Sequence, residues 1–225
     1  MTNKPSLQKE KGKEKMQKNF TALKEAIEKS RKIKQDYNVE LKKILTDQNI
    51  SEAYRSQKKA ELTASTNKVK ADILETFSSN LGELRSKLNA AHDVWKNANE
   101  PILASTLSLI QMGIQPSKTM IEQFQGDFIS MSVLSKALTK NGLYDGTEPY
   151  RLTKDTDSLV GNGVDFYADT IGLNFELGVK DVGSYSVSAA TEGLIKLSKI
   201  VGCDFETETI DYFIAGAKRG SGLSE

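Results

Sequence analysis

The chain has 225 residues, of which 38% are hydrophobic and 27% are charged, and its formal net charge is +1. This composition is typical of a protein with much of its length in solvated helix. It contains no apolar run near the roughly 20 residues that a membrane span needs, and its basic N-terminus lacks the apolar stretch of a secretory signal. We therefore expect a soluble protein made in the cytoplasm. With one cysteine, Cys203, an internal disulfide and a cysteine-based zinc site are excluded.

The charge is unevenly distributed along the chain. Residues 1–99 contain 21 lysines and arginines against 13 acidic residues, whereas residues 100–225 contain 10 against 17. A basic front half and an acidic rear half favour contacts between copies of the chain, or an acidic partner for the basic half.

The first 15 residues are rich in lysine and have almost no apolar side chains. Such a segment gains too little from burial to offset its ordering entropy, so we predict a flexible basic tail over residues 1–15. Its lysines are candidates for contact with nucleic-acid phosphates or an acidic protein face. A purely solubilising tail is the alternative, because no arginine or aromatic residue is interleaved. The candidate interaction residues here are Lys9, Lys11, Lys13, Lys15 and Lys18.

Residues 16–99 contain no proline and one glycine, Gly82. The apolar positions 16, 20, 23 and 27, and then 37, 41 and 44, follow the spacing of a coiled-coil stripe, which Ser30 and Lys34 interrupt. Turn-forming residues at 46–49 break the stripe, and Ser51 is a good N-cap for a second helix. The pattern predicts an antiparallel helical hairpin.

The predicted second helix is longer than the first, since it continues to about Ala98. The first helix would then cover only part of it. We therefore predict that Leu84, Leu88 and Trp95 pack on the rest of the chain or on another chain. Because two helices bury little surface, we also expect a homo-oligomer.

Three short helices are predicted over residues 100–142. Pro101 is suited to the first turn of one helix, which Gly113 ends, and another follows Pro116. Asp127 is a candidate cap for the third, which extends to Lys140. These elements predict a small helical cluster.

Residues 143–218 are predicted to form an α+β module. Turn-forming residues over 143–170 indicate a long irregular connection. Leu173, Phe175, Leu177 and Val179 alternate with less apolar residues, which predicts a strand, paired with 185–187 in a short β-hairpin. Helices are expected over 188–201 and 207–218, and a flexible tail over 219–225. The predicted fold class is mainly α.

The sequence contains no recognisable catalytic, cofactor-binding or metal-binding constellation. His92 is the single histidine and has no second ligand near it, and Cys203 has no neighbouring base to activate it. The glycines at 161 and 163 lack the third glycine of a dinucleotide loop, and Asp155 and Asp157 are not followed by the rest of a calcium loop. We expect a protein without enzymatic activity, cofactor or small-molecule substrate.

Four segments within about residues 40–142 share a characteristic sequence pattern: Asn49–Leu62, Leu107–Ser117, Phe124–Asp127 and Ala137–Gly142. In this pattern the chain resembles phage head-region proteins of Gram-positive hosts. The resemblance implies a structural or assembly protein: a scaffold, or a head, inner-head or connector component. The implied partners are further copies of the chain, other phage structural proteins and, weakly, DNA, with no membrane. The implied location is the host cytoplasm during assembly and, for a resident component, the virion.

The basic helical half also admits an alternative function, although its 13 acidic residues dilute the 21 basic ones. A cytoplasmic coiled-coil protein that binds nucleic acid, or that regulates another protein, would have the same pattern. It would require the basic helices to bind DNA by themselves with a steep dependence on salt.

Overall fold

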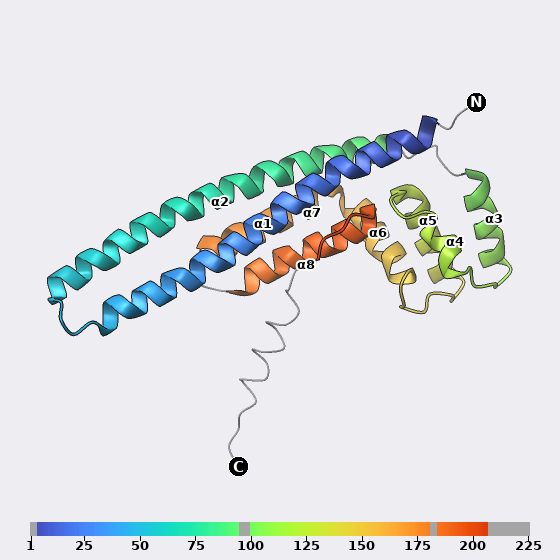
Figure 1. Ribbon diagram of the computed structural model, residues 1–225. Coiled ribbons are helices and arrows are strands. Elements are labelled where there is room, and N and C mark those ends of the chain that lie inside the picture. Colours follow the sequence, from blue (N-terminus) through green and yellow to red (C-terminus); the bar gives the residue numbers. More distant parts are fainter. Residues whose placement is uncertain (1–3, 95–99, 181–183, 207–225) are drawn as a thin grey trace, which may run out of the picture.

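The computed structural model describes residues 4–94, 100–180 and 184–206, with side chains described for 13–90, 102–180 and 186–206. The described residues form helices and connecting turns (Figure 1), which confirms the mainly α prediction. In chain order the helices are α1 (Lys4–Thr46), α2 (Glu52–Val94), α3 (Glu100–Gln111), α4 (Lys118–Glu122), α5 (Phe128–Lys140), α6 (Tyr150–Asn162), α7 (Val164–Lys180) and α8 (Ser184–Val201).

The hairpin prediction is confirmed, since α1 and α2 pack against each other as two antiparallel helices of 43 residues each. At the turn, Ser51 Oγ accepts a hydrogen bond from the backbone N–H of Tyr54, as expected of an N-cap. The Arg55 guanidinium donates to the carbonyl oxygen of Asp47 at 2.8 Å and ties the turn to α2.

Helix α1 begins much earlier than predicted. Residues 4–15 continue the helix, in place of the irregular basic tail expected from their composition. Pro5 lies in the first turn, where its missing N–H removes no helical hydrogen bond, so it does not oppose this start.

The half of the hairpin that contains the start of α1 and the end of α2 forms a four-helix bundle with α7 and α8 (Figure 1). Helix α2 packs on α7, α7 on α8, and α8 on α1, so the four helices enclose one core. Phe77 of α2 stacks on Phe175 of α7, with ring centroids 3.6 Å apart. Phe205, which follows α8, packs edge-on against Phe20 of α1, with ring centroids 5.8 Å apart. The hairpin is thus half of the main core rather than an appendage to it.

The predicted β-hairpin is wrong, because its first strand lies in α7 and its second in α8. Alternation would place the four apolar residues 173, 175, 177 and 179 on one face. Instead Phe175 and Val179 are buried, whereas Leu173 is 58% exposed and Leu177 44% exposed. The buried apolar side chains of α7 recur at a helical spacing of three or four residues. They are Val164, Ala168, Ile171, Phe175 and Val179.

A second group of helices, α3 to α6, lies at the end of the bundle away from the hairpin turn. Helix α5 packs on both α3 and α6, and α6 also contacts α7 and α8. The predicted cap is confirmed, since Asp127 Oδ1 accepts from the backbone N–H of Ser130 at 3.0 Å. The irregular connection predicted over 143–170 is wrong, because this stretch contains α6 and the start of α7. The helix and tail predicted over 207–225 lie outside the described residues.

Candidate functional site: the helical arm and the cavity at its root

Residues 31–70 form the half of the hairpin that contains the turn, and we call this part the arm; it lies beside the end of α7 at its root and projects past α7 and α8 toward the turn (Figure 1). Within the bundle, the facing side chains of α1 and α2 are fully buried, as Leu23 and Leu84 illustrate at 0% exposure. In the arm no apolar side chain is fully buried, although Ile33, Leu41 and Ile44 keep the coiled-coil spacing. The difference arises because two helices alone leave one side of their shared seam open to solvent.

Large apolar side chains also stand on the outside of the arm. They are Val39, Leu45, Tyr54 and Val69, each 45–53% exposed. The arm therefore offers partly covered apolar surface along its whole length.

The arm is basic, with ten lysines and arginines against five acidic residues. Lys43 pairs with Glu40 at 2.5 Å and Lys58 with Glu61 at 3.1 Å. Hydrogen bonds from Gln57 and then from Lys58 lower the pKa of Glu61. Exposed pairs of this kind contribute little to stability, so the excess of positive charge is the main electrostatic feature of the arm.

The predicted N-terminal lysines lie far from the arm. Lys13, Lys15 and Lys18 are exposed on α1, and Lys13 and Lys18 line a shallow hollow beside Asp204. They are separated from the hairpin turn by roughly 50 Å of helix at about 1.5 Å per residue. Lys9 and Lys11 belong to α1, and their side chains are outside the described set.

The two leucines proposed as interaction residues are core residues of this fold. Leu84 is 0% and Leu88 1% exposed, so neither is available to another chain. The reason is the early start of α1, which reaches the end of α2 that was expected to be bare. Trp95, the third apolar candidate, lies outside the described residues.

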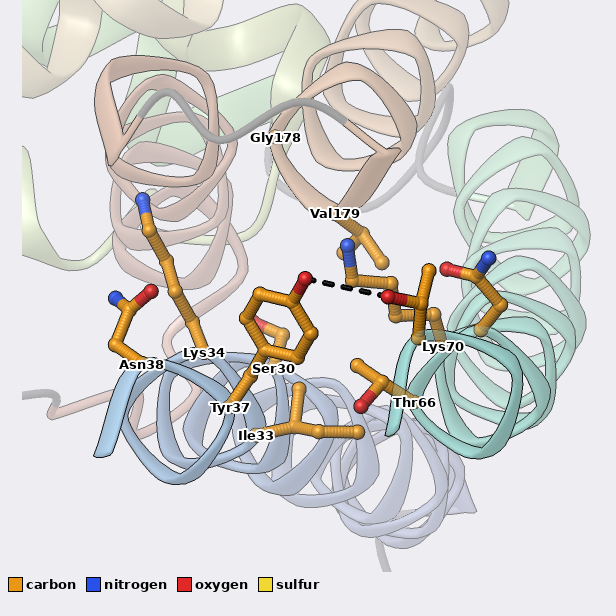
Figure 2. Close-up of a pocket in the computed structure, with 11 residues that line it drawn as sticks. Ser30, Ile33, Lys34, Tyr37, Asn38, Thr66, Lys70, Gly178 and Val179 are labelled. Atoms are coloured by element: carbon orange, nitrogen blue, oxygen red, sulfur yellow. Dashed lines mark hydrogen bonds between the residues drawn. The ribbon is translucent and has the colours of Figure 1, made fainter. Parts of the chain in front are cut away.

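A cavity of about 140 Å³ lies at the root of the arm, where the hairpin meets the end of α7 (Figure 2). It forms where polar side chains replace the apolar seam of the coiled coil. Its lining consists of Ser30, Ile33, Lys34, Tyr37 and Asn38 from α1, Thr63, Thr66, Asn67 and Lys70 from α2, and Gly178 and Val179 from α7.

Among the described residues, the cavity lining brings hydroxyl, amide and ammonium groups together with aliphatic carbon, and it includes no carboxylate. The Tyr37 hydroxyl lies 3.3 Å from Thr63 Oγ1 and bridges the two helices of the hairpin (Figure 2). Ser30 Oγ donates to the carbonyl oxygen of Ile27 at 2.7 Å, which satisfies that buried hydroxyl. This site is not among those expected from the sequence, although the interruption of the apolar stripe at Ser30 and Lys34 was its signal.

Among the described residues, no group of three or more histidine, cysteine, aspartate or glutamate side chains is placed to hold a metal ion. Cys203 is buried, as predicted for a small buried side chain, and this burial raises the pKa of its thiol to about 11. The side chain of His92 is outside the described set. No helix in the described part of the chain is long and apolar enough to cross a membrane.

Comparison with known proteins found no matching family model, no matching curated protein and no matching solved structure.

Proposed function

We propose that this chain is a non-enzymatic phage structural or assembly protein that acts through contacts made by its arm. The observation that supports the proposal is the arm itself, which projects beyond the bundle with its apolar seam half covered. The phage setting rests on the sequence resemblance over residues 40–142. Scaffold and resident head, inner-head or connector component are the two forms of this function.

The arm is a two-helix rod whose surface is available to a partner. The root of the hairpin is anchored in the four-helix bundle, where the Arg85 guanidinium contacts Asp165 at 2.5 Å and Asp169 at 2.9 Å and joins α2 to α7. From residue 31 to the turn, α1 is roughly 25 Å long at about 1.5 Å per residue, and the part nearest the turn projects beyond α7. Positive charge along this projection favours an acidic partner surface, and residues 100–225 of further copies are net acidic.

Shortening the arm tests this proposal. A variant in which residues 42–59 are replaced by a short Gly/Ser linker keeps the bundle and the cavity, so it should retain its helical folding. We expect it to lose association with particles or precursor shells in infected cells. The matched control replaces residues 47–49 alone with the same linker, which changes the turn and keeps the arm. Unchanged particle association in the shortened variant would refute the role of the arm.

Copy number distinguishes the two forms of the function. Quantitative mass spectrometry of empty precursor shells and mature particles should find the chain in shells alone if it is a scaffold. A fixed copy number in both would identify a resident component, and absence from both would refute the phage assignment.

The second candidate is a cytoplasmic coiled-coil protein that binds nucleic acid or regulates a partner, which the excess of basic residues over residues 1–99 favours. Replacing Lys9, Lys11, Lys13 and Lys15 with Gln should then weaken DNA binding and reduce its salt dependence. Binding that does not change across a salt titration would eliminate this candidate.

A further inference from the structure

Helix α7 has a second apolar stripe on the side that faces solvent. Phe175 and Val179 lie in the bundle core, whereas Phe166, Leu173 and Leu177 are each 44–59% exposed. Phe166 and Leu177 are about three helical turns apart with Leu173 between them, so the three side chains form one stripe about 16 Å long. Apolar side chains aligned in this way on an exposed helix face are the pattern that docks against another helix.

The stripe faces away from the hairpin of its own chain. Phe175, whose ring stacks on Phe77 of α2, is about two and a half turns from Phe166 and thus lies on the opposite side of α7. Because α2 packs on that opposite side, the arm of the same chain cannot reach the stripe.

We propose that the stripe on α7 is the docking site for the arm of a second copy of the chain. This inference rests on the proposed function, since it names the acidic partner surface to which the arm binds. The arm has a matching face: Tyr54 and Val69 of α2 are both 45% exposed, and they lie about four turns apart on the same side of the helix. The apolar side chains of the two helices then pack along one another.

The charges around the two faces favour this pairing. Three carboxylates flank the stripe and outnumber the two cations that pair with them. The carboxylates belong to Asp165, Asp169 and Glu176, and the cations to Arg85 and Lys180. The arm brings ten lysines and arginines against five acidic residues. A second copy of the stripe is a poorer partner, because it adds carboxylates to carboxylates, whereas an arm adds cations.

Sedimentation velocity of the purified full chain over a concentration series tests the contact. A single pair of helices buries less than the roughly 1,600 Å² of a standard interface, so we expect reversible association with a Kd between about 1 μM and 1 mM. Added salt should weaken the association, because the two faces attract each other by charge. A full chain that stays monomeric up to about 1 mM would overturn the inference. If the arm-shortened variant nevertheless loses particle association, the arm acts through another protein and the proposed function stands.

Two double variants, each lacking one half of the contact, identify the surfaces that meet. Phe166→Gln with Leu173→Gln removes the stripe, and Tyr54→Gln with Val69→Gln removes the face of the arm. Each variant alone should raise the Kd of self-association about tenfold or more, because apolar contact is lost on one side. An equimolar mixture should restore a dimer with one chain of each variant, since the intact arm of one meets the intact stripe of the other.

Met112→Gln with Ile114→Gln is the matched control, because it removes two exposed apolar side chains just after α3, in the second group of helices. It should associate with the wild-type Kd. Every replaced side chain is at least 45% exposed, so circular dichroism should show wild-type helix content in all three double variants. Wild-type self-association of the arm variant would overturn the inference and indicate that two stripes pack on each other. A mixture of the arm and stripe variants that stays monomeric would overturn it as well.

Discussion

Replacement of Gly178 by alanine tests the close approach of α7 and α8, on which the bundle depends. A Cβ at Gly178 would lie 2.5 Å from Val187 Cγ2 and 2.6 Å from the backbone nitrogen of Val187. The side-chain contact can be relieved by a rotamer change, but the backbone contact can be relieved only if the helices separate. We therefore expect Gly178→Ala to be destabilising.

The magnitude follows from comparison with a second glycine. Gly82 lies on the exposed face of α2, and a Cβ there meets nothing within 4 Å. Gly82→Ala should thus stabilise the protein by about 0.5–1 kcal/mol, the usual gain of replacing glycine inside a helix. Overpacking at Gly178 costs about 1–3 kcal/mol, so the two variants should differ in the sign of their effect.

Urea unfolding followed by circular dichroism measures both variants. The midpoint should fall for Gly178→Ala and rise for Gly82→Ala, with similar slopes, because neither change alters the surface exposed on unfolding. If Gly178→Ala were as stable as Gly82→Ala, then α7 and α8 would not approach as closely as the structure shows.

Three further predictions follow from the packing and the charges. Phe175→Ala should lower the free energy of unfolding by about 3–5 kcal/mol, because the Phe175 ring is fully buried and its removal leaves a cavity in the core. The control Phe166→Ala removes a ring that is 59% exposed and should change the free energy of unfolding by about 0.5 kcal/mol or less. Urea titrations measure both changes. Hydrogen bonding to Arg85 lowers the pKa of Asp165. This pair therefore stabilises the fold at pH values above the ordinary aspartate pKa, and the stabilisation is lost as the pH falls through the lowered pKa. Arg85→Gln should raise the pKa of Asp165, which an NMR titration measures. The Cys203 thiol, with its pKa of about 11, should react slowly with a disulfide reagent at neutral pH and rapidly after unfolding. Because this pKa is raised by folding, the contribution of the protonated thiol to stability is complete below the ordinary thiol pKa and is lost as the pH rises toward 11.

The hairpin could be predicted because its information is local. The spacing of Phe20, Leu23 and Ile27 and the cap at Ser51 act over one or two turns of helix, where sequence pattern and structure correspond directly. The start of α1 could not be predicted, since lysine-rich residues 4–15 give no apolar period and belong to the helix as its continuation.

The C-terminal part was misread because its periodicity is ambiguous over a short window. Residues 173–179 fit a period of two as well as a helical period, and only the packing decides between them. In the structure Phe175 is buried against Phe77, a residue almost 100 positions earlier in the chain. The same limitation applies to Gly193, where a Cβ would lie 2.7 Å from Ile171 Cγ1: a glycine inside a helix shows its role only when the facing helix is known.

The cavity and the arm share one origin in the sequence. The apolar seam of α1 and α2 becomes polar at Ser30 and Thr66, at the level where α7 ends. Inside the bundle, α7 and α8 cover the apolar seam of the hairpin, whereas beyond this level no helix of the described residues covers it. The interruption of the stripe thus marks a change from core to projecting rod.

The energetics of the arm favour a function in which many copies act together. Fully burying a large apolar side chain contributes about 1.5–3 kcal/mol, so covering the remaining half of Val39, Leu45, Tyr54 and Val69 would contribute about 3–6 kcal/mol in all. Association requires roughly 4–15 kcal/mol for lost translational and rotational freedom, so a single arm would bind its partner weakly. Weak contacts become effective when copies are held side by side, because each further contact is then nearly intramolecular. A symmetric assembly provides this arrangement, and a solitary regulatory protein does not.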